Sequence, residues 1–160
     1  MRRGGYTLIE LLVVVGITAL LFGAGMAAYR GIGEKQALKE AGASFQSNLR
    51  LFQQKALVSE KPTICSSKKF KGFTVHYESA SSYSVYAECE PAAVTTVTSI
   101  TLKDGVEFDG GFNNVFFQVL KAEVLNGGVE GSQTITLKKG TLKYQVSIDQ
   151  RGGISGGFLP

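Results

Sequence analysis

The sequence is poor in the side chains from which most metal sites and catalytic sites are built. Among its 160 residues it has no tryptophan, one histidine (His76) and two cysteines (Cys65 and Cys89). A tetrahedral zinc site takes four nitrogen or sulfur ligands, so these residues cannot form one within a single chain. His76 lies in an alternating segment, which favours an exposed sheet residue over a catalytic base. We therefore expect no metal, no cofactor and no enzymatic activity.

The glycines lack the surroundings of a nucleotide-binding loop. Neither Gly110-Gly111 nor Gly127-Gly128 is followed by the lysine and helix that accompany a phosphate-cradling loop. Asp104, Asp109 and Asn113 lie together in a glycine-rich region and could bind calcium, but their spacing matches no calcium-loop motif. Turn formation explains them better, and no small-molecule substrate is indicated.

The chain also carries little net charge. The formal net charge is +4, and Arg2 and Arg3 supply half of it. The rest of the chain is close to balanced, so the overall charge says little about an anionic partner.

One long apolar run dominates the N-terminal part of the chain. Leu11–Ala28 is free of charge and lies near the lower length limit for a helix that spans a hydrocarbon core of about 30 Å. Arg2 and Arg3 precede it, as in a single-span anchor or in a secretory signal peptide cut near Gly25-Met26-Ala27, which would release a soluble protein. Neither interpretation explains Glu10 at the head of the run. A carboxylate at the centre of a membrane helix costs roughly 2.5–3.5 kcal/mol.

The helical pattern continues beyond the apolar run. From Arg30 the sequence becomes amphipathic, and Lys61-Pro62 is the expected stop because proline disfavours helix in the residue before it. We therefore predict one long helix, with residues 6–29 in the membrane and residues 30–60 packed on a globular domain. Apolar residues at three- and four-residue steps define the packing stripe: Leu38, Ala41, Phe45, Leu49, Phe52 and Ala56.

Residues 61–160 are predicted to form a β-rich globular domain. Apolar and polar side chains alternate with a period of two, and glycine-containing turns separate the runs. The predicted strands cover residues 73–77, 83–89, 99–103, 115–120, 134–138 and 142–148. Short strands at this spacing indicate antiparallel sheet, which the apolar stripe of the helix can cover. The predicted fold class is therefore α+β, with a long N-terminal helix packed on antiparallel sheet.

The two cysteines could form one disulfide. If the chain after residue 30 lies outside the cytoplasm, a bond between Cys65 and Cys89 is the natural expectation. Closing a loop of about 25 residues would stabilise the fold by roughly 3 kcal/mol. The alternative is two separate buried thiols.

The segment Gly5-Tyr6-Thr7-Leu8-Ile9-Glu10 resembles the processing motif of type IV pilins and type II secretion pseudopilins. In that family a prepilin peptidase cuts after the glycine, and the new N-terminal residue is methylated. The resemblance implies a leader at residues 1–5, cleavage between Gly5 and Tyr6, and N-methylation of Tyr6, where tyrosine replaces the usual phenylalanine. It also implies that helix 6–29 first spans the cytoplasmic membrane once and then forms the core of a filament outside the cytoplasm. The expected partners are the membrane, the peptidase and other pilin subunits.

The same resemblance gives Glu10 a role in assembly. Glu10 is the fifth residue of the mature chain, where the family places a glutamate that is taken to neutralise the N-terminal amine of a neighbouring subunit. Such a pairing is strong in a low dielectric and would fix the register of helix packing. The alternative is that Glu10 lies at the level of the lipid headgroups and contributes nothing.

A looser resemblance concerns the C-terminal part. The runs Val115–Leu120, Thr134–Leu137 and Tyr144–Ile148, followed by Gly152-Gly153-Ile154, are similar to H-type minor pseudopilins and FimT-like minor pilins. This similarity implies two packed antiparallel sheets.

Some FimT-like proteins bind DNA through basic residues near the C-terminus, so DNA is an alternative partner. A patch that follows phosphates would bind in a strongly salt-dependent way. The alternative is that these lysines are solvated and protect strand edges. The candidate contacts are Lys138, Lys139, Lys143 and Arg151, with Lys68, Lys69 and Lys71 as a second cluster.

Overall fold

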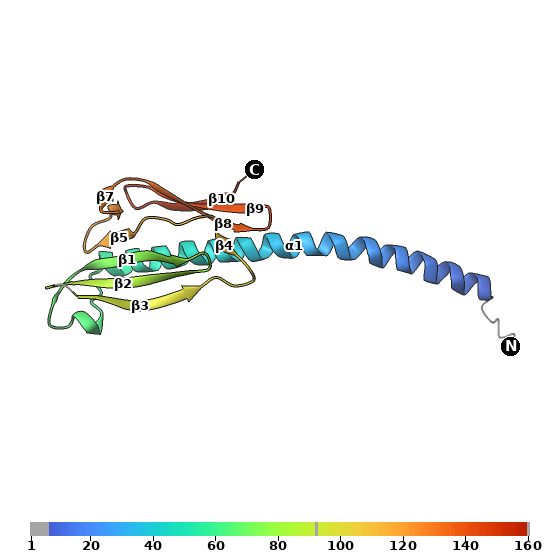
Figure 1. Cartoon of the computed structure of the whole chain (residues 1–160), viewed down its shortest axis with the longest axis horizontal. Coiled ribbons are helices and arrows are strands. Elements are labelled where there is room, and N and C mark those ends of the chain that lie inside the picture. Colours follow the sequence, from blue (N-terminus) through green and yellow to red (C-terminus); the bar gives the residue numbers. More distant parts are fainter. Residues whose placement is uncertain (1–6, 92, 160) are drawn as a thin grey trace. The chain divides into compact units, whose positions relative to one another are not determined.

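The computed structural model describes residues 7–91 and 93–159, without the side chains of residues 24–30, 93, 129 and 130. This part of the chain forms a long helix, α1 (Leu8–Leu57), a 3-10 turn, η1 (Thr63–Cys65), and ten strands (Figure 1). The strands are β1 (Lys69–Ser79), β2 (Ser82–Glu90), β3 (Ala93–Thr101), β4 (Glu107–Phe108), β5 (Val115–Gln118), β6 (Val124–Asn126), β7 (Val129–Glu130), β8 (Gln133–Lys139), β9 (Leu142–Ile148) and β10 (Ile154–Phe158).

The chain divides into two compact units, residues 1–35 and residues 36–160. The described part of the first unit is a helix whose side chains are all exposed, including large apolar ones such as Leu8 and Phe22. The second unit contains the last turns of α1 and every strand.

α1 ends earlier than residue 60 because Ser59 adopts a left-handed conformation, with φ 54°. The amide of Ser59 then donates to the carbonyl of Ala56, and the amide of Glu60 donates to that of Lys55. This is the Schellman pattern, in which a left-handed residue satisfies carbonyls that the helix leaves open. The helix boundary is therefore set by a serine in place of the usual glycine, which the sequence pattern did not indicate.

The predicted apolar stripe of α1 packs in the second unit. Leu38, Phe45, Leu49, Phe52 and Ala56 are buried, and Ala41 is partly buried, which confirms the helical periodicity. Gln46 is an exception to the polar face that the pattern predicts, because it is buried and donates a 2.8 Å hydrogen bond to the hydroxyl of Tyr144. A buried amide needs such a partner, and the pattern of the helix alone does not provide it.

Two antiparallel sheets accompany the helix. One has six strands in the order β3-β2-β1-β5-β6-β7, and the other has four in the order β10-β9-β8-β4. The structure thus confirms the α+β class and the two-sheet arrangement. The prediction for residues 99–103 was wrong in its bounds, because β3 begins at Ala93. The strands β4, β6, β7 and β10 were missed, since they are short or, in β10, contain two glycines.

The core of the second unit joins α1 to both sheets. The ring of Phe45 packs 4.9 Å from that of Tyr83 in β2 and 5.5 Å from that of Phe108 in β4, measured between ring centroids. Gly42 allows α1 to approach Tyr144 of β9, because a Cβ there would come within 2.4 Å of the tyrosine ring. All buried apolar residues of the core lie between Leu38 and Ile154, so the second unit contains a complete core of its own.

Candidate functional site

The N-terminal motif is described from Thr7 onward. Gly5 and Tyr6, between which cleavage is predicted, lie outside the described residues, as does the whole leader 1–5. Glu10 lies in the first turn of α1 and is exposed. A carboxylate at this end of a helix is favourable because the N-terminus carries a partial positive charge.

Thr7 caps the helix, a role that we did not predict. Its Oγ1 accepts a 3.3 Å hydrogen bond from the backbone amide of Glu10, and its carbonyl accepts from the amide of Leu11. Thr7-Leu8-Ile9-Glu10 has the form of a capping box, in which the side chain of the fourth residue can bond back to the amide of the first. This four-residue pattern was the signal in the sequence that could have identified Thr7.

The apolar stretch that follows Glu10 is exposed along its described length. Leu11 to Gly23 are all exposed, while the side chains of residues 24–30 are not described. In the residues that could be searched, no helical stretch combines the length and the apolar character that crossing a bilayer requires. The predicted span Leu11–Ala28 therefore lies partly outside the residues described in full.

The structure joins Cys65 and Cys89 in a disulfide, with their Cα atoms 5.8 Å apart. Cys65 lies in η1, just after α1, and Cys89 lies near the end of β2. Both side chains are buried in the core. The bond thus fastens the segment that leaves the helix to the six-stranded sheet.

The four basic residues proposed for DNA contact do not form one patch. Lys138 and Lys143 each pair with the carboxylate of Asp109, at 3.3 Å and 2.6 Å. Lys139 donates to the backbone carbonyl of Asp104. Arg151 lies in the turn before β10, at the opposite end of β9 from Lys143, which is about 20 Å along a strand of that length.

Asp109 is held ionised by these lysines. The hydrogen bond from Lys143 and then that from Lys138 lower the pKa of Asp109 below its usual value. Asp109 therefore belongs to an ion-pair cluster with two lysines and not to the calcium site considered with Asp104 and Asn113. In the described ranges, no three His, Cys, Asp or Glu side chains gather closely enough to hold a metal ion.

His76 lies half-buried on β1. Its Nδ1 is 2.6 Å from Oδ1 of Asn114, and its ring is 5.8 Å from that of Tyr86 between centroids. These contacts place His76 on the sheet as predicted, although its side chain is half-buried and the alternating pattern predicted an exposed one.

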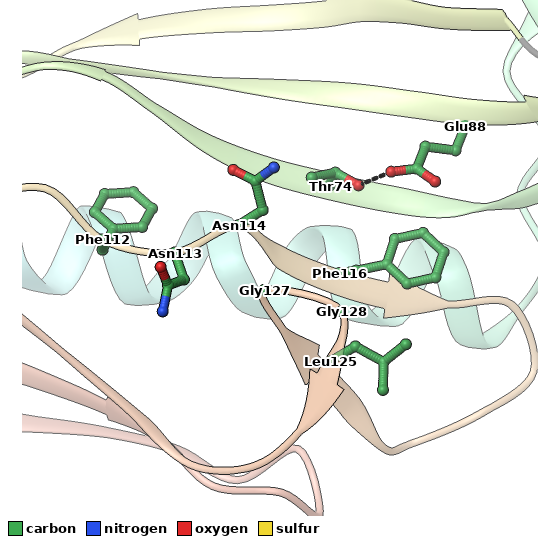
Figure 2. A pocket seen from close by; sticks show the side chains of 9 residues that line it. All are labelled: Thr74, Glu88, Phe112, Asn113, Asn114, Phe116, Leu125, Gly127 and Gly128. Atoms are coloured by element: carbon green, nitrogen blue, oxygen red, sulfur yellow. Dashed lines mark hydrogen bonds between the residues drawn. The ribbon is translucent and has the colours of Figure 1, made fainter.

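A hollow of about 480 Å³ lies on the outer side of the six-stranded sheet (Figure 2). Its floor includes Thr74, whose hydroxyl donates to the carboxylate of Glu88. Asn114 and the ring of Phe116 lie along its walls. The hollow offers hydroxyl, amide and carboxylate groups to a ligand, and its lining includes neither a histidine nor a cysteine.

Comparison with known proteins gave one result that bears on these features. Residues 1–26 match the family model described as the prokaryotic N-terminal methylation motif. Searches of curated proteins and of solved structures gave no match. The matched segment includes the predicted cleavage site, Tyr6, Thr7 and Glu10, and it supports the interpretation of this chain as a type IV pilin-like protein.

Proposed function

We propose that this protein is a minor pilin or pseudopilin of the H-type or FimT-like kind, a structural subunit of a type IV pilus or a type II secretion pseudopilus. The observation that carries the proposal is the methylation motif over residues 1–26, with Glu10 in the first turn of α1. The two antiparallel sheets support the finer assignment, as do the strands β5, β8 and β9, which cover most or all of the runs that resemble this subgroup.

We propose that the chain matures in two stages, first in the membrane and then in a filament. In the first, residues 6–29 anchor the precursor in the cytoplasmic membrane, and prepilin peptidase removes residues 1–5 and methylates Tyr6. In the second, the same helix leaves the lipid and packs in the core of a filament, with the globular domain outside the cytoplasm. The Cys65–Cys89 disulfide supports this location, because such bonds persist in oxidising compartments.

Glu10 has two positive charges to compensate in this scheme. Cleavage would create an amine at Tyr6, next to the helix end that Thr7 caps. That helix end already carries a partial positive charge, so an added amine is unfavourable without a nearby carboxylate. The carboxylate of Glu10 would offset this charge and, in the filament, bind the amine of a neighbouring subunit.

Mass spectrometry of the mature N-terminus tests the processing step. We expect N-methylated Tyr6 in cells that contain prepilin peptidase, and an intact Met1 in cells that lack it. A Gly5→Val variant should also keep Met1, because it removes the residue after which the peptidase cuts. A terminus near Ala28 would replace the proposal with a secretory signal peptide. An intact Met1 in the presence of the peptidase would leave only an anchored protein.

A further inference from the structure

The most open edge of the second unit is strand β3, Ala93–Thr101. It is the last strand of the six-stranded sheet, and β2 is its neighbour (Figure 1). Within the described residues, β3 pairs with β2 and with no other strand. Its other side therefore presents amides and carbonyls that can pair with a further strand.

The composition of β3 favours pairing. Its nine residues include no charge, no proline and no glycine, and seven of them are β-branched. Natural edge strands are usually short, charged or covered, and the other edges of this unit follow that rule. β4 and β7 have two residues each, and β10 has five, with Arg50 of α1 donating to its Ile154 carbonyl. β3 has only a bulge at Val97 to protect it.

The bulge gives β3 a symmetric order of faces. Before Val97, Thr95 lies on the core side opposite Ala87, and Val94 and Thr96 lie on the outer side. After it, Thr98 and Ile100 lie on the core side opposite Val85 and Tyr83, while Ser99 and Thr101 lie on the outer side. The extra residue at Val97 shifts the alternation by one position. As a result, the order of core-facing and outward-facing side chains is the same whether β3 is followed from Val94 or from Thr101. A strand of this kind can pair with a second copy of itself about a two-fold axis.

We propose that two copies of this protein associate through antiparallel pairing of their β3 strands, which would join the two six-stranded sheets edge to edge. The symmetric faces select the register in which Val94 lies opposite the partner copy's Thr101, and Thr96 lies opposite its Ser99. Pairs of β-branched or hydroxyl side chains stabilise such contacts, and no like charges oppose each other.

A hollow beside β3 fits the same arrangement. It holds about 240 Å³ between the helix residues Ala37 and Ala41 and the strand end at Ile100 and Leu102. In the proposed register, Thr95 of the second copy lies opposite Ile100 and projects on this side of the sheet. Strand addition commonly combines main-chain bonds at the edge with hollows that receive alternate side chains.

The interface is small, so the association should be weak. Nine residues a side is well below the roughly 20–30 residues of a standard stable interface. Sedimentation velocity on the full chain in detergent micelles should show a monomer–dimer equilibrium between about 1 μM and about 1 mM. Chemical cross-linking of the same sample should capture the dimer.

Two matched double variants test the register. Val94→Lys with Thr101→Lys places like charges opposite each other at both ends of the contact and should weaken the dimer by about tenfold or more at low salt. Val94→Lys with Thr101→Glu changes the same positions but opposes unlike charges, and should dimerise at least as well as the unmodified protein. The side chains of Val94 and Thr101 are both exposed and form no hydrogen bond with the described residues, so both variants should keep the thermal stability of the parent, measured by circular dichroism.

Three outcomes would overturn the proposal. The first is a monomer throughout the concentration range. The second is equal dimerisation of the two double variants, which would place the contact elsewhere. The third is loss of the dimer in both, with folding intact, which would exclude the register. The proposal is independent of pilin processing, because the contact is made by β3 and the register variants change no residue of the N-terminal motif.

Discussion

At the scale of single residues, the place of Glu10 in the helix cap can be separated from its proposed role in assembly. Its backbone amide bonds to the Thr7 hydroxyl, and its side chain has the position of the acid in a capping box. Its charge is the proposed partner of the amine of another subunit. Glutamine can serve a capping box as glutamate does, but it carries no charge.

We therefore predict that Glu10→Ala and Glu10→Gln both leave membrane insertion intact and both abolish incorporation into filaments. The cause is loss of the charge that compensates a buried amine, which glutamine cannot replace. Fractionation of membranes and sheared filaments, with immunoblotting, measures the two steps separately. If Glu10→Gln assembled normally while Glu10→Ala did not, capping would explain Glu10 and the charge pairing would be wrong.

A second prediction at the residue scale concerns Gly42 and the stability of the domain. Glycine to alanine in a helix normally gains about 1 kcal/mol in propensity, but here a Cβ would meet the Tyr144 ring at 2.4 Å. We expect Gly42→Ala to destabilise residues 36–160 by about 1–2 kcal/mol, the net of that gain and of overpacking. Urea denaturation measures it. Gly157→Ala is the control, because no atom lies within 4 Å of its added Cβ, and it should be close to neutral.

At the scale of elements, the disulfide joins η1 to β2. Removing it by Cys65→Ala with Cys89→Ala should lower the free energy of unfolding by roughly 3 kcal/mol, because the unfolded chain regains the freedom of the closed loop. Urea denaturation with and without reductant checks this value. Reductant should destabilise the parent and have no effect on the double variant; equal stability of the oxidised and reduced parent would contradict the prediction.

Asp109 links β8 and β9 through its two lysines, and it makes the stability depend on pH. Because the pKa of Asp109 is lowered in the folded state, its contribution is present above the ordinary value of 3.8 and is lost as the pH falls through the lowered pKa. Asp109→Asn should therefore reduce the melting temperature slightly at pH 6. The difference from the parent should vanish well below pH 3.8. A difference that persisted in strong acid would indicate a cause other than the charge.

The sequence predicted the long elements whose apolar residues recur at regular spacing. It did not predict the places where a single residue interrupts that spacing or ends an element. The stripe from Leu38 to Ala56 and the alternation in β8 and β9 reflect burial on one face, which sequence records directly. In β1 and β2 the polar residues Thr74 and Ser84 are buried as well, which the alternation did not predict. β10 was missed because Gly156 and Gly157 interrupt the alternation, although the Gly156 backbone lies close to Gln46. The end of α1 depends on the backbone of Ser59, which no side-chain pattern reveals.

The sequence predicted some parts of the candidate site and missed others, for a similar reason. The cysteine pair was identified because the sequence has only these two cysteines, whereas the assembly role of Glu10 stays a prediction. The basic residues were grouped by their closeness in sequence, whereas β9 separates Arg151 from Lys143 in space. Asp109 lies far from its lysines along the chain, so its ion pairs could not be foreseen.

At the scale of the whole molecule, the two units should differ in their independence. The second unit contains the complete core and the disulfide, so residues 36–160 should fold alone in aqueous buffer with a cooperative thermal transition. Circular dichroism and amide hydrogen exchange measure this. A non-cooperative transition, with rapid exchange in β1 and β2, would show that the core requires residues before Gln36.

The hydrogen bonds of Gln46, Arg50 and Gln53 can form only late in the synthesis of the chain. These helix residues donate to the Tyr144 hydroxyl, the Ile154 carbonyl and the Gly152 carbonyl, partners that are made 98 to 104 residues later in synthesis. Because the ribosome makes the N-terminal part of a chain first, these donors have no protein partner until residues 144–154 have been made. The helix can therefore complete these contacts only after β9, β10 and the turn between them have been made, so the four-stranded sheet is the last part of the domain to pack on α1.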